Sequence, residues 1–327
     1  MRRRHLLTLA AASLPGLPRA ADGWTDETWP DPARGRTVPV RLRWPPGEAP
    51  CAVVMHSHGL GGSRAGGAVW GEAWQAAGFL VIHLQHPGSD TDTLREQGLA
   101  GLRRAAGPEA YVQRLFDAHF ALDELLRRQR AGGAWARVRP DAIGFSGHSF
   151  GARLTQALAG ERPPRAPDSA WARAAEPRLR AFIAFSPGFN ERDGIDDASL
   201  QRRFGAITRP FLCITGTQDD AMIVGDASNA ARRAVWRGLP PGQRAQLVLE
   251  GADHMSFGGG SGVAVRPGGA RWLRRASGAV ELEPQHQRLV AALTSDWWRW
   301  RLLGDAAARE RLARPAGLAP GDLWELG

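Results

Sequence analysis

Lysine is missing from this sequence of 327 residues, so all 42 of its basic residues are arginine. Set against 33 acidic residues, they give a formal net charge of +9 at pH 7. A protein that binds nucleic acid usually gathers its positive charge on one face or along one helix. Here the arginines are spread along the chain in short runs such as "LRRQR". The pattern indicates a compositional preference for arginine, with mild attraction to anionic substrates as the remaining interpretation, and predicts no nucleic-acid partner.

Cysteine is also scarce, which excludes a disulfide framework. The two cysteines, Cys51 and Cys213, lie in the apolar runs "CAVVMHSHG" and "PFLCITG". Neither belongs to a C-x-x-C pair of the kind that binds zinc, so no metal site is expected there. We expect both thiols to fill small spaces in the core.

Long apolar runs are missing as well. No segment has about 18 uninterrupted apolar residues, which predicts no transmembrane helix. Residues 1–21 combine an arginine-rich start, a short apolar stretch and small residues at Ala20 and Ala21, which is typical of a secretory signal peptide. Arg3 and Arg4 resemble a twin-arginine export signal. We expect an exported protein, periplasmic or secreted; a disordered basic N-terminus is the alternative.

Continuous apolar runs alternate with helical patterns along the rest of the chain. Such runs are typical of strands buried on both faces of a parallel sheet. The alternation predicts an α/β fold in one domain over residues 22–327, with a mostly parallel central sheet and helices on both faces. A proline- and arginine-rich stretch near 162–180 is predicted to be a surface insertion. The expected strands are 36–45, 51–59, 79–84, 141–149, 180–188, 210–220 and 245–257, and the expected helices are 70–78, 110–130, 150–160 and 285–305.

One short motif carries the first chemical signal. The stretch "FSGHSFGARL" contains Gly147-His148-Ser149-Phe150-Gly151, a G-x-S-x-G pattern between a predicted strand and a predicted helix. This setting predicts a nucleophilic serine on a strained turn, at the sheet edge where ligands of open α/β sheets bind. Gly147 and Gly151 would let the strand and the helix approach each other closely.

A serine hydroxyl needs a base, and a base needs an orienting acid. His254 follows the last apolar run and is the candidate base, because only it comes late enough for the chain order serine, acid, histidine. His56 and His58, after the first buried strand, come too early. The acid should lie between Ser149 and His254, at the end of a strand.

The stretch "CITGTQDD" offers two acids at such a strand end. Asp219 is the favoured acid and Asp220 is its near alternative. Glu191 and Asp193, after the preceding strand, are more distant alternatives. A glycine-rich loop "HSHGLGGS" follows the first buried strand and could present a backbone amide to an oxyanion. We assign the oxyanion-hole donors to the N–H groups of Leu60 and Phe150.

These motifs resemble the platelet-activating-factor acetylhydrolase and predicted dienelactone hydrolase group of α/β hydrolases. The resemblance rests on "SHGLGG", "GHSFGA", "HPGSD", the late "DHMSF" and a tryptophan-rich helix ending in "LLGD". It implies the α/β-hydrolase fold from about Ala49 to Ala308, Ser149 as nucleophile and His254 as base. Dienelactone hydrolases proper use cysteine instead of serine. Mammalian-type acetylhydrolases take their acid one strand earlier, where "AFIAFSPG" offers none, and this favours Asp219.

Together the motifs predict a serine carboxylic-ester hydrolase that acts on a small-molecule ester through an acyl-enzyme. This chemistry requires no cofactor and no metal. The aromatic residues Trp70, Phe150, Phe189 and Phe257 are candidates for an apolar acyl pocket, with core packing as the alternative. An amide or peptide hydrolase with the same triad, or an inactive hydrolase-like binding protein, are the alternative functions. The sequence predicts neither the oligomeric state nor the natural substrate.

Overall fold

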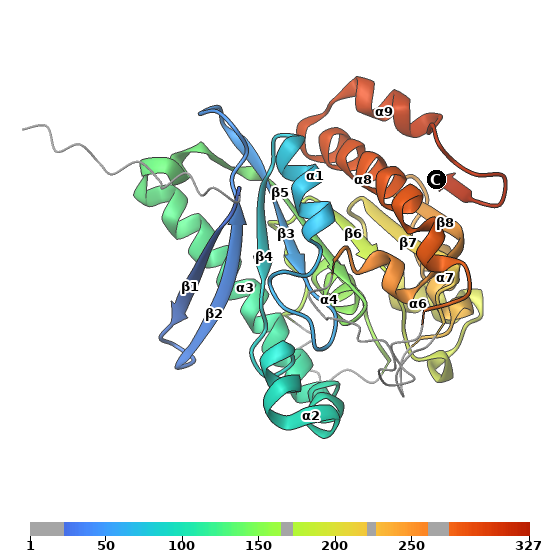
Figure 1. Ribbon diagram of the computed structural model, residues 1–327, viewed down its shortest axis with the longest axis horizontal. Coiled ribbons are helices and arrows are strands. Elements are labelled where there is room, and N and C mark those ends of the chain that lie inside the picture. The colour runs from blue at the N-terminus through green and yellow to red at the C-terminus, as the bar shows by residue number, and fades with distance from the viewer. Residues whose placement is uncertain (1–22, 165–172, 221–226, 261–274) are drawn as a thin grey trace, which may run out of the picture.

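The computed structural model describes residues 23–164, 173–220, 227–260 and 275–327. Its described strands form one nine-stranded sheet in the order β1-β2-β4-β3-β5-β6-β7-β8-β9 (Figure 1). The strands are β1 (Thr25–Asp31), β2 (Arg36–Arg43), β3 (Cys51–Ser57), β4 (Leu80–Leu84), β5 (Val138–His148), β6 (Ala181–Phe185), β7 (Phe211–Gln218), β8 (Arg244–Asp253) and β9 (Leu323–Leu326).

The six central strands, from β4 to β8, run parallel to one another. At the edges, β2 pairs antiparallel with β4, and β1 with β2, while β9 pairs antiparallel with β8. Every residue of β3, β4 and β6 is buried, as expected for strands covered on both faces. The predicted α/β class and mostly parallel sheet are therefore confirmed.

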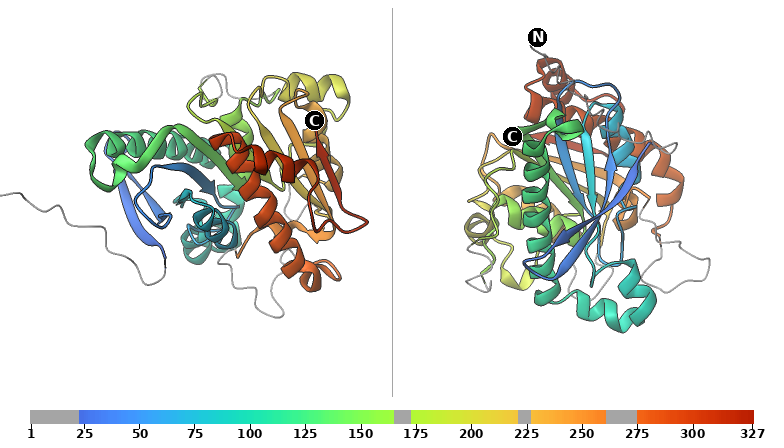
Figure 2. Two further views of the ribbon diagram at one scale, coloured as in Figure 1. Left: turned by 90° about the horizontal axis from the view of Figure 1, so that it is seen from above. Right: turned by 90° about the vertical axis from the view of Figure 1, so that its left-hand side faces the viewer.

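Helices cover both faces of the sheet (Figures 1 and 2). One apolar cluster joins the sheet to α3, α4, α6 and α7, and a second joins its other face to α1, α8 and α9. The remaining helix, α2, lies near one end of the sheet (Figure 1). The helices are α1 (Ala68–Ala76), α2 (Thr91–Ala105), α3 (Pro108–Ala131), α4 (Phe150–Ala159), α6 (Asp197–Phe204), α7 (Asn229–Gly238), α8 (Ala279–Leu303) and α9 (Ala306–Ala313).

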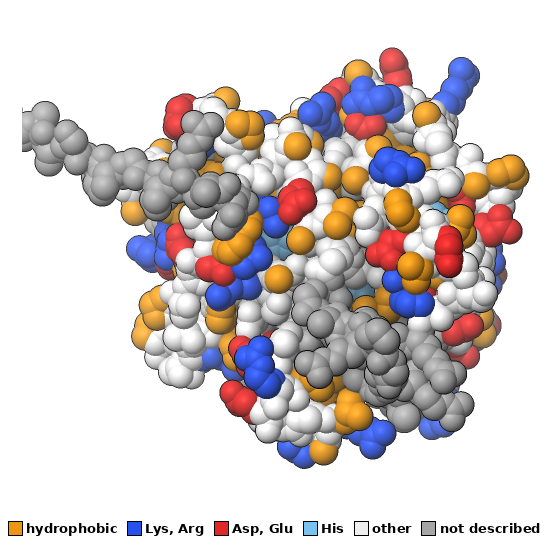
Figure 3. Space-filling model, viewed as in Figure 1, with side chains coloured by type: hydrophobic (Ala, Val, Ile, Leu, Met, Phe, Trp, Pro, Cys, Tyr) orange, Lys and Arg blue, Asp and Glu red, His pale blue; other side chains and the backbone are white. Residues whose placement is uncertain are grey.

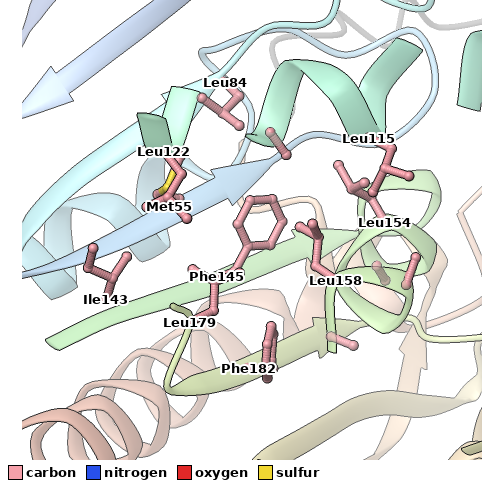
Figure 4. Packing of buried hydrophobic residues seen from close by; sticks show 14 of the residues in the cluster. Met55, Leu84, Leu115, Leu122, Ile143, Phe145, Leu154, Leu158, Leu179 and Phe182 are labelled. Carbon is pink, nitrogen blue, oxygen red and sulfur yellow. The ribbon is translucent and has the colours of Figure 1, made fainter. Parts of the chain in front are cut away.

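Alternate residues of each central strand divide between the two apolar clusters. Met55 and Phe145 face α3 and α4 (Figure 4), whereas Val54 on the same strand as Met55 faces α1 and α8. Full burial of one such side chain contributes about 2–3 kcal/mol. Cys51 and Cys213 are free and buried, as predicted. This two-sided core holds the carboxyl ends of the parallel strands at one edge, where the polar motifs lie.

Two of the predicted segments fall partly or wholly outside the described residues. The signal peptide predicted over residues 1–21 lies outside them, as do residues 165–172 of the insertion predicted near 162–180. In the described part of that insertion, buried Glu176 pairs with Arg178 and His119. No helix in the described ranges has the length and apolarity to span a membrane. On the face drawn in Figure 3, arginine and acidic side chains are interspersed.

Candidate active site

Ser149 stands on a sharp turn between β5 and α4. Its backbone has φ 56° and ψ −111°, and among the described non-glycine residues only Ser186 also has a positive φ. A β-carbon added at Gly147 would collide with the backbone of Gly151, and one added at Gly151 would collide with the carbonyl oxygen of Ser57. Both glycines are therefore required by close backbone approach, and the turn stores strain of the kind found at functional sites.

His254 reaches the serine from the last parallel strand. It begins η3 (His254–Phe257), a short helix after β8 whose first turn is capped reciprocally by Asp253 and Ser256. His254 Nε2 lies 2.9 Å from Ser149 Oγ, and Nδ1 lies 2.8 Å from Asp219 Oδ1. Because the Asp219 carboxylate can only accept, Nδ1 carries the hydrogen and Nε2 is left to accept from the serine hydroxyl. The structure thus brings the three predicted residues together in one hydrogen-bonded chain.

Asp219 is fully buried, and its carboxylate is surrounded by donors. Its Oδ2 accepts hydrogen bonds from the hydroxyls of Ser186 (2.7 Å) and Thr215 (2.9 Å). Its Oδ1 lies 2.8 Å from Nε of Arg232, which comes from α7. Burial by itself would raise the pKa of Asp219, but the charges of Arg232 and His254 outweigh it and lower the pKa to about 2. The carboxylate is therefore ionised at neutral pH.

The alternative acids bond elsewhere. Asp220 is exposed, and its Oδ1 accepts from the amide of Asn229 at 3.2 Å. Asp193 forms an ion pair with Arg203 at 2.8 Å. Glu191 accepts from the hydroxyl of Ser228. None of these contacts directs a carboxylate toward His254.

The alternative bases are also engaged elsewhere. His56 Nδ1 lies 2.9 Å from Ser146 Oγ inside the sheet, and His58 Nδ1 lies 2.6 Å from the Gly59 carbonyl oxygen. Both side chains are buried, and burial lowers the pKa of each well below its usual value. They act as neutral core residues in this fold.

Four residues that sequence reasoning did not single out contact Asp219 or His254. Ser186, Thr215 and Arg232 hold Asp219, and Arg232 also donates from Nε to the Asp219 carbonyl oxygen at 3.0 Å. His148 Nε2 lies 3.0 Å from the carbonyl oxygen of His254, and the two rings are 4.8 Å apart. Burial, and then the charge of His254, lower the pKa of His148 to about 3, so it is a neutral donor. No local signal distinguishes Arg232 from the other arginines, whereas His148 lies inside the serine motif.

The two expected oxyanion donors belong to segments that adjoin the serine. Phe150 is the first residue of α4, where helix amides are free and the helix dipole favours negative charge. Leu60 lies in the turn after β3. Its neighbour Gly59 is so close that an added β-carbon would lie 3.5 Å from Ser149 Cβ. Within the described residues, neither amide donates to a backbone carbonyl outside the regular helices and strands.

A cavity of about 370 Å³ lies between α3, α4 and α6; Phe150, the residue after the serine, lines it, whereas Ser149 and His254 do not. Phe150 and Arg153 of α4 lie on its wall. Of the four aromatic residues considered for an acyl pocket, only Phe150 lines this cavity. Trp70, Phe189 and Phe257 are packed in the core, with at most 1% of each side chain exposed. Among the residues that the structure describes, no cluster of His, Cys, Asp and Glu is suited to hold a metal ion.

Comparison with known proteins supports the fold described above. No family model matches the chain, and no curated protein matches it. Among solved structures, the chain is similar to the crystal structure of 2,6-dihydroxy-pseudo-oxynicotine hydrolase, with a TM-score of 0.51 and 16% sequence identity. The alignment covers 86% of this chain and 68% of that one. A likeness at this identity establishes the architecture alone: the chain has the predicted α/β-hydrolase fold.

Proposed function

We propose that the protein is a serine hydrolase that cleaves carboxylic esters through an acyl-enzyme. The observation that carries the proposal is the chain of two short contacts, Ser149 Oγ to His254 Nε2 at 2.9 Å and His254 Nδ1 to Asp219 Oδ1 at 2.8 Å. It starts from a serine whose strained backbone exposes the hydroxyl at the sheet edge. This geometry suits Ser149 as the nucleophile, His254 as the general base and Asp219 as the orienting acid.

The proposed reaction has two halves. Ser149 Oγ attacks the ester carbonyl while His254 Nε2 takes its proton, and the oxyanion accepts from the amides of Leu60 and Phe150. His254 then gives the proton to the departing alkoxide, which leaves as the alcohol. A water molecule, deprotonated by His254, attacks the acyl-serine. Collapse of the second oxyanion breaks the ester bond to Ser149 Oγ, which takes the proton back from His254 as the carboxylic acid leaves.

The electrostatics fit these roles. An ionised Asp219 stabilises the imidazolium that forms in both halves of the reaction and keeps the hydrogen on Nδ1 of His254. Ser186, Thr215 and Arg232 hold the carboxylate in place, so it needs no reorganisation when charge develops.

For the substrate, we place one part of the ester in the cavity beside Phe150. Its volume of about 370 Å³ is near the lower end of small-molecule sites. The resemblance of "SHGLGG" and "GHSFGA" to the acetylhydrolase and dienelactone hydrolase group supports a carboxylic ester of modest size.

The test combines covalent labelling with substrate comparison. An alkyl fluorophosphonate should add one equivalent to the wild type and none to Ser149→Ala, with full labelling of the control Ser295→Ala, whose serine lies on α8. p-Nitrophenyl acetate should be turned over by the wild type and by Ser295→Ala only. If p-nitroanilides are cleaved faster than matched esters, the enzyme is an amide hydrolase. If neither labelling nor turnover occurs, the protein is a binding protein and the proposal fails.

We also propose that the protein is exported through its arginine-rich N-terminus, residues 1–21. The proposal rests on Arg3, Arg4 and the short apolar stretch that follows them. Replacing Arg3 and Arg4 together by lysine should keep the protein in the cytoplasm, because twin-arginine recognition depends on arginine and not on charge alone. An unchanged periplasmic yield would reject the twin-arginine route.

A further inference from the structure

A buried arginine donates hydrogen bonds to the loop that carries Leu60. Arg114, on α3, is fully buried. Its Nη1 donates to the carbonyl oxygen of His58 at 2.6 Å, and its Nη2 donates to that of Gly59 at 3.2 Å. Its Nε and Nη2 also donate to Ser89, at 2.7 Å to the hydroxyl and 3.0 Å to the carbonyl oxygen. One guanidinium therefore joins two consecutive carbonyls of the loop to the segment after β4.

The bond to Gly59 sets the direction of the next amide. In a planar trans peptide, the C=O and N–H bonds point in opposite directions. Because the Gly59 carbonyl points toward Arg114, the Leu60 N–H of the same peptide unit points away from it. Gly59 itself is close to the nucleophile, since a β-carbon added to it would lie 3.5 Å from Ser149 Cβ.

A histidine reinforces the same orientation. The backbone N–H of His86 donates to His58 Nε2 at 3.2 Å, so the hydrogen of the neutral His58 ring is on Nδ1. That Nδ1 lies 2.6 Å from the Gly59 carbonyl oxygen and donates to it. The Gly59 carbonyl thus accepts from His58 and from Arg114, and both bonds turn it in one direction.

The ring of Phe150, whose amide is the second expected oxyanion donor, contacts the guanidinium of Arg114. The Cζ atom of Arg114 lies 4.6 Å from the centre of the Phe150 ring, within the range of a cation–π interaction. The motif "HPGSD" supplies the remaining support, since the Ser89 carbonyl also accepts from the Gly61 amide at 2.9 Å. Arg114 is therefore in contact with the chain on both sides of the proposed oxyanion hole.

The position of this cation is energetically unusual. Among the residues that the structure describes, no carboxylate forms an ion pair with Arg114; it donates to carbonyl and hydroxyl oxygens, and its Nη2 also lies 3.4 Å from His58 Nδ1. A buried charge without a direct counter-ion is costly. Burial lowers the pKa of Arg114 to about 9, while the nearby charges of Asp117 and Asp90 oppose the change, so the group stays charged at neutral pH.

We propose that Arg114 is the positioning residue of the oxyanion hole: it turns the Gly59–Leu60 peptide so that the Leu60 N–H faces the developing oxyanion. The inference rests on the proposed ester hydrolysis. Arg114 does not touch the substrate, and it acts through the backbone of the loop. Its removal should therefore weaken binding of the transition state and leave binding of the ground-state ester nearly unchanged.

The test compares Arg114→Met with a matched control on the same helix. Arg128→Met also removes a guanidinium, one that is partly buried and pairs with Glu27 and Glu124 far from the serine, and should lower the melting temperature only. For Arg114→Met we expect kcat for p-nitrophenyl acetate to fall about 10²-fold, as for loss of one oxyanion donor, with KM changed less than about threefold. Affinity for an alkyl trifluoromethyl ketone, whose hemiketal oxyanion occupies the same hole, should fall by the same factor.

Two further variants keep the outcome decisive. Arg114→Lys retains the charge but cannot reach both carbonyls, so it should not restore kcat. If Arg114→Met does not fold, Ser89→Ala takes its place, with an expected loss of about three- to tenfold in kcat and in ketone affinity. The inference is overturned if kcat and ketone affinity in the folded variant stay at the wild-type values while the melting temperature falls as in Arg128→Met. If the wild type itself lacks Ser149-dependent turnover, the proposed function fails instead.

Discussion

Asp219 and Asp220 are adjacent in the chain, yet only Asp219 faces the histidine. Asp219 is fully buried and bonded to His254, whereas Asp220 is exposed at the amide of Asn229. We expect Asp219→Ala to lower kcat for ester hydrolysis about 10⁴-fold, in line with loss of the acid from other triads. Asp220→Asn should lower kcat less than about threefold, because it removes only an exposed charge and keeps an oxygen that can accept from the Asn229 amide.

Asp219→Asn should fall between these limits, for a reason specific to this site. An asparagine can present either its oxygen or its NH₂ to His254, and an NH₂ would force the wrong tautomer. Here the positive Arg232 Nε lies 2.8 Å from the oxygen that His254 contacts, which favours the amide oxygen at that position. The hydroxyls of Ser186 and Thr215 can rotate to accept from the NH₂.

The correct tautomer then survives, and only the negative charge is lost. Weakening a buried, charge-assisted contact to the imidazolium by about 3–4 kcal/mol corresponds to about 10²–10³-fold in kcat. The variant should also lose about 3 kcal/mol of unfolding free energy, because the buried ion pair between Arg232 and residue 219 is lost.

Initial rates with p-nitrophenyl acetate, and urea unfolding followed by circular dichroism, measure the two effects separately for all three variants. A larger loss for Asp220→Asn than for Asp219→Asn would move the acid by one residue, and equal losses would also refute the assignment. If Asp219→Asn is as inactive as Asp219→Ala, the amide has adopted the opposite orientation and the reasoning about Arg232 is wrong.

Two more predictions concern the serine turn and the acid stability of the fold. Gly151→Ala should unfold the protein more easily and reduce ester turnover at least about tenfold, because its β-carbon would collide with the Ser57 carbonyl; wild-type kcat and melting temperature would contradict this. Burial lowers the pKa values of His83, His86 and His148 to about 3, 4 and 3. Below pH 6.5 the unfolded state therefore binds more protons than the folded state, and the free energy of unfolding decreases as the pH is lowered. At pH 5 each should cost about 2 kcal/mol, seen as a lower urea midpoint than at pH 7, and equal midpoints would argue against neutral buried imidazoles.

Much of the architecture followed from local patterns. The continuous apolar runs at 51–59, 79–84 and 210–220 became β3, β4 and β7, because a strand covered on both faces has no polar side to alternate with. The prediction missed the edge strands, β1 and β9. β9 (Leu323–Leu326) is short and only half-buried, and it exists because it pairs with β8 from far along the chain. Pairing of this kind leaves little signal in four residues.

For the candidate site too, some features could be predicted from the sequence and others depend on long-range packing. The serine motif and the chain order of serine, acid and histidine have a steric or chemical reason, so sequence reasoning could name Ser149 and His254 before any geometry was known. It favoured Asp219 as the acid but left Asp220 open. The catalytic roles of these residues, and the export of the chain, stay predictions. The amide of Leu60 was named from its loop alone, whereas its direction depends on Arg114, which lies on another helix.

By itself, the sequence determined the layered fold, the strained serine turn and the residue types that gather at the carboxyl edge of the sheet. Tertiary structure alone decided which of two adjacent aspartates faces the imidazole and which arginines are buried against the site. The physical reason is that periodicity and turn chemistry act between neighbours in the chain. Burial of a charge depends on what long-range packing places around it, and 42 arginines look alike until that packing exists.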